Sequence, residues 1–566
     1  MSEQWKIKSV NVGLVQHLQR VLGIDEVLCR LLVLRGVTTY EEAYRFFRPR
    51  WEHLHNPLLM ADMDRALERI HRAVGNGEHV LIYGDYDVDG ITATALLFDF
   101  LNSLMPGRVH YYIPDRQREG YGLSLQGIAY AQARQVSLVI TVDCGIKSHE
   151  VMSQGVARGL DFIVCDHHLP PPALPPAVAV LDPLRADCAY PYKELSGCGI
   201  ALKLVQAWHQ HMGNPVEALV PWLDLVALSI AADLVPITGE NRVLAAMGLK
   251  QLEASRRLGL RMLISMSGRR RPLRISDIVF GLAPALNAAG RLEHAEVAVR
   301  LMLAANKQVA ETYARKLIQL NELRKQKDQL LTQQAMAQAV GLEHEPAVVL
   351  YHPDWHRGLL GIGAARLVEQ LQRPVVLLSQ KEEGLLVGSG RSVEGLDLYA
   401  ALRTCAPMLE QFGGHAHAAG LSLRMADLEP FKAAFVKAIA RQRATRPQGP
   451  RLEVEAELPL CRITPKFWRI LQQFAPFGPG NPNPLFLARQ VRQHGSTRVI
   501  KDTHLSMQLT DGAHVTFPAI AFYQGQHLEA VSSGQPFDIC YKIEEDRFEG
   551  RGHWRLQVRA FRFCSA

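Results

Sequence analysis

The chain has 566 residues, of which 48% are hydrophobic and 21% charged. This balance is ordinary for globular protein and excludes a disordered chain, a collagen-like chain and a small disulfide scaffold. Lys and Arg outnumber Asp and Glu by 63 to 56, so the formal net charge is only +7. So mild an excess permits a polyanionic partner without requiring one, because the clustering of charges decides what a surface binds. At about 150 residues per domain, the length predicts three to four domains.

The nine cysteines are scattered and form no C-x-x-C pair. Zinc ribbons and thioredoxin-type motifs are therefore not expected, and unpaired thiols fit a reducing compartment. The first twenty residues lack the apolar core of a signal peptide. No run approaches the roughly 18 apolar residues that span a bilayer, since the best candidate, 222–235, contains two aspartates. We expect a cytoplasmic protein with no membrane partner.

Residues 1–60 predict an N-terminal helical segment, and a different pattern occupies 61–306. There, short apolar runs alternate with helical stretches, which predicts a parallel sheet with helices on both faces. The predicted strands are 79–84, 109–113, 138–142, 162–166 and 178–181, and the predicted helices between them include 91–104 and 125–134.

Residues 307–340 contain neither Gly nor Pro and predict one long helix, taken as 307–342, between two lobes. A second α/β pattern occupies 343–445, and a linker is predicted at 441–451. Residues 450–566 alternate short strands and turns, which predicts a small β barrel. The predicted fold class is therefore α/β: a parallel-sheet domain, a long connecting helix, a second α/β domain and a C-terminal barrel.

The sharpest local feature is the run of alternating aspartates Asp85, Asp87 and Asp89, directly after a predicted buried strand. Packing three carboxylates together costs repulsion unless a cation neutralises them. The run resembles the start of an EF-hand calcium loop, which needs a Glu at its twelfth position and a helix on each side. Here the twelfth residue is Leu96 and a strand precedes the run, so the EF-hand interpretation fails.

The next strands end in similar residues. Asp143 follows one, Asp166, His167 and His168 end the next, and Asp233 closes an apolar helical run. A lone Asp at a strand end is usually a turn or cap residue, but the carboxyl ends of parallel strands meet at one edge, where α/β proteins bind ligands. Carboxylates with imidazole suit Mn²⁺ or Mg²⁺ better than structural zinc. The cluster is large enough for two ions, which can clamp a phosphoryl group and activate a water.

These runs resemble the DHH phosphoesterase superfamily, named for a motif that matches Asp166-His167-His168. A closer resemblance, over nearly the whole chain, is to its RecJ family of bacterial single-strand-specific 5′→3′ exonucleases. It is carried by segments that include YGDYDVDGITATALL, VITVDCGI, CDHHLP, AADLVPITGENR, LNAAGRLEHA, WHRGLLGIGAARL, FGGHAHAAG and PFGPGNPNPLF.

The resemblance implies a set of site residues in the first domain. Metal ligands are expected at Asp85, Asp87, Asp89, Asp143, His167 and Asp233, with Asp85 either a ligand or a residue that orients one. Asp166 and His168 are expected in catalytic positions. Asp166 would orient a histidine, and His168 would lie near the scissile phosphate as a ligand or a hydrogen-bond donor.

The second lobe is similar to the DHH-associated domain, whose signature matches GGHAHAAG at 413–420. Glycines let backbone N–H groups approach a phosphate, and Arg can hold a phosphate with two parallel hydrogen bonds. Each of the arginines concerned could instead form a structural ion pair. The expected phosphate- or DNA-binding residues are Arg116, Arg291, Ser389, Arg391, Gly414 and His415.

The terminal domain resembles an OB-fold, which binds single strands through a basic groove and aromatic stacking platforms. Most of its aromatics are core residues by default, and the sequence does not say which one or two could stack on bases. An Arg-rich run at 254–276 is either a solvated face or a surface that follows phosphates.

Together these features predict a single-stranded-DNA-specific 5′→3′ exonuclease that releases 5′-mononucleotides with two Mn²⁺ or Mg²⁺ ions, acting in DNA recombination and repair. The family implies a single-strand-binding protein and a helicase as partners, and a monomer is the default. Two alternatives stay open. One is a DHH phosphodiesterase acting on short oligonucleotides or cyclic dinucleotides, which leaves the terminal domain unused. The other is an inert DNA-binding scaffold, which would have lost the metal ligands that this chain keeps.

Overall fold

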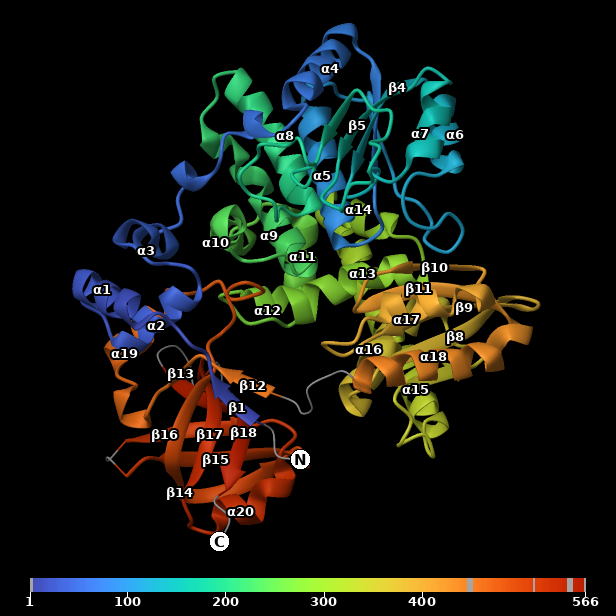
Figure 1. The fold of residues 1–566 in the computed structure, drawn as a ribbon. Coiled ribbons are helices and arrows are strands. Elements are labelled where there is room, and N and C mark those ends of the chain that lie inside the picture. Colours follow the sequence, from blue (N-terminus) through green and yellow to red (C-terminus); the bar gives the residue numbers. More distant parts are fainter. Residues whose placement is uncertain (1–3, 445–450, 513–514, 547–552, 564–566) are drawn as a thin grey trace. The chain divides into compact units, whose positions relative to one another are not determined.

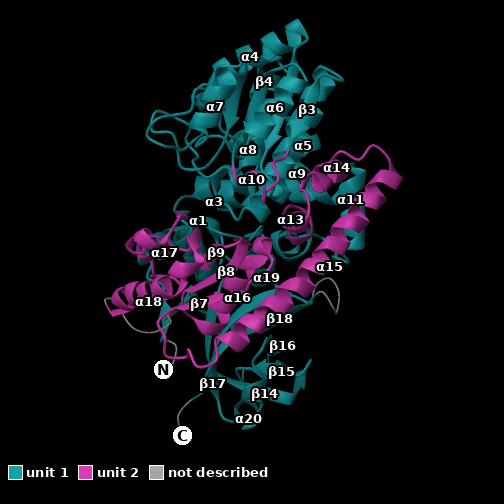
Figure 2. Cartoon of the chain, turned by 90° about the vertical axis from the view of Figure 1, so that its right-hand side faces the viewer, with its two compact units in different colours: residues 1–112, 122–283, 449–566 teal, residues 113–121, 284–448 magenta. Residues whose placement is uncertain are grey.

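The computed structural model describes residues 4–444, 451–512, 515–546 and 553–563, and Figure 1 labels its elements. The chain forms two compact units, coloured separately in Figure 2. Unit 1 comprises residues 1–112, 122–283 and 449–566, and unit 2 comprises residues 113–121 and 284–448. The domain boundaries expected from the sequence stay predictions. No helix in the described ranges is long and apolar enough to cross a membrane.

Unit 1 contains a five-stranded sheet in the order β3-β2-β4-β5-β6, with every pair parallel. Figure 1 shows helices α5 and α8 on one side of it and α6 and α7 on the other. Both faces are therefore buried, which is why its strands are near-continuous apolar runs in the sequence. The bounds are β2 (His79–Gly84), β3 (Val109–Tyr112), β4 (Val136–Val142), β5 (Asp161–Cys165), β6 (Ala179–Leu181), α5 (Val88–Leu104), α6 (Leu125–Ala133), α7 (His149–Val156) and α8 (Gly197–His211).

Unit 1 contains further helices, and a fully buried ion pair joins one of them to α8. Lys203 of α8 binds Glu240 of α10, and neither side chain is exposed. Glu240 also accepts hydrogen bonds from the Tyr190 hydroxyl at 2.6 Å and from the His55 backbone N–H at 2.8 Å. These further helices are α4 (Met63–Asn76), α9 (Leu223–Ala232), α10 (Gly239–Glu253), α11 (Leu258–Met266) and α12 (Ile275–Asp277).

The two ends of the chain pack together within unit 1. Helices α1 (Val12–Leu22), α2 (Glu26–Leu34) and α3 (Tyr40–Phe47) share one hydrophobic cluster with α19 (Pro465–Gln472) and the C-terminal strands. Strand β1 (Gln4–Ile7) pairs in parallel with β12 (Arg451–Val454). The sequence predicts the N-terminal helices but not their partner, because contacts between opposite ends of a chain leave no local signal.

The C-terminal strands of unit 1 close into a barrel, because β14 pairs with β17 as well as with β15. Strand β13 (Ala456–Glu457) pairs with β14, and α20 (Leu528–Ser532) lies between β16 and β17 in the chain. The barrel strands are β14 (Phe486–Ile500), β15 (His504–Thr510), β16 (Thr516–Ala521), β17 (Phe537–Glu545) and β18 (Trp554–Phe563).

The glycine-rich loop that follows α19 contacts the segment between α9 and α10. The Ile237 backbone N–H donates to the Pro479 carbonyl at 2.7 Å. A Cβ on Gly478 would lie 2.6 Å from Ile237, and a Cβ on Gly480 would lie 2.9 Å from Thr238. Only glycine permits so close an approach, so this loop fixes the chain immediately after α9.

Unit 2 has a five-stranded sheet in the order β10-β11-β9-β8-β7, in which only β7 and β8 pair in parallel. One core cluster joins it to α17 and α18, and another joins it to α15 and α16. The bounds are β7 (Val348–Tyr351), β8 (Val375–Glu382), β9 (Leu385–Arg391), β10 (Gln411–Gly414), β11 (Ala418–Arg424), α13 (Ala283–Leu292), α14 (Glu296–Met302), α15 (Lys307–Gln338), α16 (Leu360–Leu371), α17 (Leu398–Thr404) and α18 (Leu428–Ala444).

The predicted fold class is confirmed: a parallel-sheet domain, a long helix, a second α/β domain and a terminal β barrel. Helix α15 spans 32 residues, as the absence of Gly and Pro predicts. It ends at Gln338 and not at the predicted residue 342, because the chain turns at 339–341, where Gly341 has a left-handed backbone. The linker predicted at 441–451 is wrong at its start, because α18 continues to Ala444 with its apolar face packed in the core. Residues 445–450 of that prediction lie outside the described residues.

The buried Lys203–Glu240 pair makes a stability prediction. We expect Lys203→Met to lower the free energy of unfolding by about 3–5 kcal/mol, because it leaves a buried carboxylate uncompensated. Denaturant unfolding followed by tryptophan fluorescence measures this loss. Lys325→Met, which removes an exposed partner of Glu322, is the matched control, with an expected change within about 0.5 kcal/mol. Equal effects of the two variants would contradict the prediction.

Candidate active site

The predicted metal ligands converge at the carboxyl-terminal edge of the parallel sheet. Among the described residues, three groups of ligand atoms each lie within 4.8 Å of one another. Because the groups share Asp143 and His167, they form one continuous site. The groups are Asp85, Asp87 and Asp143; Asp89, His167 and Asp233; and Asp143, His167 and His168.

The turn between β2 and α5 presents the three alternating aspartates. Asp87 caps α5, since its Oδ1 accepts hydrogen bonds from the backbone N–H groups of Asp89 at 2.9 Å and Gly90 at 3.2 Å. A Cβ on Gly90 would lie 2.5 Å from the backbone nitrogen of Asp85. The tight turn therefore requires glycine at position 90.

Asp89 is buried against the start of α8. Its carboxylate accepts hydrogen bonds at 2.7 Å from the backbone N–H groups of Gly197 and Cys198 and from the Ser229 hydroxyl. Because a helix N-terminus favours negative charge, these contacts stabilise the ionised form of the buried Asp89 carboxylate. A Cβ on Gly197 would lie 2.7 Å from the Cβ of Asp143. Sequence reasoning missed Gly197 and Ser229, although the small-residue run SGCG at a helix start was an available signal.

His167 lies at the centre of the carboxylates. Its Nε2 is 3.1 Å from an Asp143 oxygen, 3.7 Å from an Asp233 oxygen and 3.8 Å from an Asp89 oxygen. Asp143 has a left-handed backbone with φ 59°, which costs energy in a residue other than glycine. Such strain concentrates at functional sites, where surrounding contacts hold it in place.

Asp166 orients the two histidines from outside the three groups. It is fully buried. Its Oδ1 accepts hydrogen bonds from Nδ1 of His168 at 2.7 Å and from the backbone N–H of His167 at 2.8 Å. The Ile146 backbone N–H donates to its other oxygen at 3.0 Å. Burial opposes ionisation, but these hydrogen bonds hold the pKa of Asp166 below its ordinary value. Burial lowers the pKa of His168, but Asp166 outweighs this and raises it above its ordinary value.

Without a cation, the carboxylates of the cluster repel one another, and burial adds to the cost of their charge. Burial, reinforced by the neighbouring carboxylates, raises the pKa of Asp143 well above its ordinary value. The same two causes raise the pKa of Asp233 to about 8. A divalent cation removes this penalty, and carboxylate oxygens with imidazole are a donor set that Mn²⁺ accepts. The residues present therefore fit the metal ions expected from the sequence.

A second cluster gathers at the start of α16 in unit 2. The Arg391 guanidinium donates to the Ser389 hydroxyl at 2.9 Å and to the Gly390 carbonyl at 2.8 Å. A Cβ on Gly361 would lie 2.6 Å from the Arg391 guanidinium. Burial, and then the nearby charge of Arg116, lowers the pKa of Arg391. Two cations held close at a helix start favour an anion between them.

Arg291 lies at the same helix start, because its guanidinium donates to the Gly358 carbonyl at 3.1 Å. A Cβ on Gly358 would lie 2.4 Å from the Arg291 carbonyl oxygen. Four of the six predicted phosphate-binding residues thus surround the beginning of α16. Sequence reasoning missed Gly358 and Gly361, for which the glycines of the segment WHRGLLGIG were the signal.

The remaining two predicted residues, Gly414 and His415, lie at the turn between β10 and β11. Gly414 has φ 142°, and a Cβ there would lie 2.3 Å from the Ala418 carbonyl oxygen. His415 is exposed. Ala418 is the register partner of Arg391, so this turn adjoins the strand end that carries Arg391.

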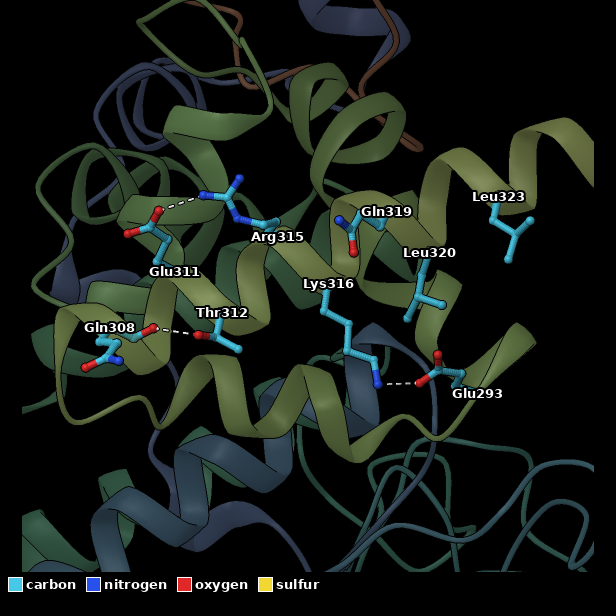
Figure 3. A pocket seen from close by; sticks show the side chains of 9 residues that line it. All are labelled: Glu293, Gln308, Glu311, Thr312, Arg315, Lys316, Gln319, Leu320 and Leu323. Atoms are coloured by element: carbon cyan, nitrogen blue, oxygen red, sulfur yellow. Dashed lines mark hydrogen bonds and ion pairs between the residues drawn. The ribbon is translucent and has the colours of Figure 1, made fainter.

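A separate cavity of about 520 Å³ lies along α15 in unit 2 (Figure 3). Its two cations are already paired: Arg315 lies 2.7 Å from Glu311, and Lys316 lies 2.6 Å from Glu293. The paired charges give this cavity no preference for phosphate, and none of the predicted site residues lines it.

Part of the Arg-rich run at 254–276 forms ion pairs within unit 1. Arg257 pairs with Asp99 at 2.9 Å, and Arg271 and Arg274 have acidic partners in unit 1. Arg256 and Arg261 are exposed, so a role in following phosphates is confined to part of the run.

Comparisons with known proteins agree with this organisation. Three family models match: "DHH family, N-terminal domain" at residues 79–230, "DHHA1 domain" at 344–441 and "RecJ OB domain" at 454–560. The single-stranded-DNA-specific exonuclease RecJ of Bacillus subtilis is 34% identical over 98% of this chain and 70% of its own length. The RecJ exonuclease of Dickeya dadantii is 34% identical over 95% of this chain and 96% of its own length. The chain belongs to the RecJ family.

Solved structures of the family share its fold. The crystal structure of RecJ from Thermus thermophilus in complex with Mn²⁺ has a TM-score of 0.84 and 28% identity, and the match covers 100% of this chain and 80% of that one. The complex of the same protein with Mg²⁺ has a TM-score of 0.79, with 100% and 79% covered.

The raised pKa values predict how the metal-free protein responds to pH. The pKa of Asp233 is about 8 in the folded chain against an ordinary value of 3.8. Between these values the folded state binds more protons than the unfolded state, so stability falls as the pH rises. Thermal unfolding in chelator measures this. We expect Asp233→Asn to raise the midpoint more at pH 8 than at pH 5. The exposed control Asp354→Asn shifts both midpoints equally, and parallel pH profiles for wild type and Asp233→Asn would contradict the assignment.

Proposed function

We propose that this protein is a metal-dependent exonuclease that degrades single-stranded DNA from the 5′ end and releases 5′-mononucleotides. Its role would be in DNA recombination and repair, as its family suggests. The observation that carries the proposal is the convergence of six carboxylate and imidazole ligands at one sheet edge of a chain that also has the second lobe and the barrel.

We propose that two Mn²⁺ or Mg²⁺ ions are held by Asp85, Asp87, Asp89, Asp143, His167 and Asp233. Such ions neutralise the phosphate and lower the pKa of a bound water, so that it can attack phosphorus. His168 supports the same reaction from the protein side. Its Nδ1 is held by Asp166, which leaves Nε2 to donate to a phosphate oxygen. Nε2 would donate in the protonated ring, whose charge the buried Asp166 carboxylate stabilises.

The cluster at the start of α16 would bind a backbone phosphate of the strand. Arg391, Ser389, Arg116 and Arg291 would supply side-chain donors, and the start of α16 would supply backbone N–H groups. Gly414 and His415 would adjoin this phosphate from the β10–β11 turn. The barrel would hold the strand further along its length.

The proposal extends to the partners and the location of the protein. Single-stranded DNA would be the substrate, and a single-strand-binding protein and a helicase would act beside the enzyme. The protein would work as a monomer in the cytoplasm. The eight described cysteines, all of which are free, support the cytoplasmic location, because a reducing compartment keeps thiols unpaired.

The ligand assignment predicts the loss of turnover in two variants. We expect Asp143→Asn and His167→Ala each to lower kcat at least about a hundredfold, since even residues that only orient metal ligands cost 10- to 100-fold. The assay follows a 5′-labelled single strand with Mn²⁺, and Asp64→Asn on the exposed start of α4 is the control. Undiminished activity in both variants would refute the site. A labelled dinucleotide cleaved faster than the long strand would favour the phosphodiesterase alternative, and cleavage from the 3′ end would refute the polarity.

The Arg391 cluster predicts a binding defect. We expect Arg391→Ala to raise the KM for a single strand roughly tenfold or more, because a charge-assisted hydrogen bond to phosphate is lost. Steady-state kinetics separate this change from kcat, which we expect to move less. The exposed Arg403→Ala of α17 is the matched control. If both variants kept the wild-type KM, Arg391 would have a structural role only.

A further inference from the structure

One aromatic side chain of the barrel lies outside its core. Phe486 and Phe537 are fully buried, and Phe517 is 6% exposed. Tyr523 is 77% exposed and is the one exposed Phe, Tyr or Trp among the described residues of 486–563. The sequence does not separate the aromatic residues of this domain from one another. The structure does, because only the Tyr523 ring among the described ones is open to solvent.

Tyr523 has a strained backbone conformation that a hydrogen bond from its own N–H fixes in place. Its φ is 56°, a left-handed conformation that is unfavourable for a bulky residue. Its N–H donates to Nδ1 of His504 at 3.0 Å. The His504 ring also stands edge-on to the Tyr523 ring, with centroids 4.7 Å apart and planes at 86°. A glycine would relieve this strain, so the tyrosine ring is kept at a cost in stability.

Tyr523 lies at the part of the barrel where OB-folds bind oligonucleotides. It follows β16, and β15 and β16 are the second and third barrel strands; in OB-folds the face of these two strands, with the loop between the first and second strands, forms part of that site. The turn between β14 and β15 adjoins it, because the Gly525 N–H donates to the Thr503 carbonyl at 2.9 Å. A Cβ on Gly525 would lie 3.2 Å from that oxygen, which shows how closely the two segments pack.

Exposed cations lie on the strands and the turn that adjoin this segment. Arg498 lies near the end of β14, where its register partner is Ser506 of β15, and Lys501 lies in the following turn. Arg559 of β18 is exposed, and its backbone carbonyl accepts a hydrogen bond from the Gln524 side chain at 2.7 Å. These three exposed cations and one exposed acid, Asp502, on the adjoining strands and turn leave a net positive charge, which fits the pairing of phosphate attraction and base stacking in single-strand binding.

We propose that Tyr523 is a base-stacking platform for single-stranded DNA on the barrel, with Arg498, Lys501 and Arg559 attracting the adjacent phosphates. The inference rests on the proposed function and adds to it a named contact. Stacking on an aromatic ring tolerates every base, which suits an enzyme that must pass along a strand of any sequence. The fixed backbone means that the ring needs little ordering when a base arrives.

The test measures the binding of a fluorescent oligothymidylate by anisotropy, without divalent metal so that the strand stays intact. Loss of one stacked base corresponds to a roughly 5- to 150-fold weaker Kd, and we expect this for Tyr523→Ala. Tyr523→Phe keeps the ring and binds like wild type. Tyr40→Ala removes another exposed tyrosine, 50% exposed at the start of α3, and is the matched control.

Two further measurements separate stacking from folding and from phosphate contacts. Tyr523→Gly should be at least as thermally stable as wild type, because glycine accepts the backbone conformation, yet bind as weakly as Tyr523→Ala. On an abasic strand of the same length, wild type and Tyr523→Ala should bind equally. A wild-type Kd for Tyr523→Ala, or an equal loss on the abasic strand, would overturn the inference. Failure of wild type to bind or degrade single strands would instead refute the proposed function.

Discussion

Five buried or half-buried aspartates at one sheet edge repel one another unless a cation joins them. The rest of unit 1 is arranged around this constraint. Gly90 and Gly197 let backbone approach the aspartates to distances that any Cβ would prevent. The start of α8 partly compensates the charge of Asp89, and Asp166 keeps its own hydrogen bonds to the histidines. The site is therefore built from helix ends and tight turns as much as from its ligands.

Much of this could be predicted from the sequence, for physical reasons. A strand buried on both faces is a short, near-continuous apolar run, so β2, β4 and β5 were readable without their partners. Parallel strands deliver their carboxyl ends to one edge, so Asp143 and His167 could be expected to meet. The positions of Asp87 and Asp89 could be predicted from their spacing in one short turn, because the geometry of that turn depends on only a few neighbouring residues.

The remainder depends on contacts between distant segments. Nothing local indicates that Ser229 supports Asp89, or that the loop containing Gly478 packs against Ile237, a few residues after α9 and Asp233. The exposure of Tyr523 likewise follows from the barrel register and from the turn that precedes His504. Composition alone treats that ring as one more core aromatic.

The pairing of β1 with β12 has a consequence for biosynthesis. Residues 4–7 leave the ribosome long before their partners at 451–454, which are made only after all of unit 2. At about 5–20 residues per second, the first strand waits roughly 20–90 seconds for its neighbour. Apart from its early segment 113–121, unit 2 is contiguous from 284 to 448 and can complete its sheet in the meantime. The nascent chain is thus expected to complete unit 2 before β1 pairs, and a product terminated before residue 451 leaves β1 unpaired and prone to association.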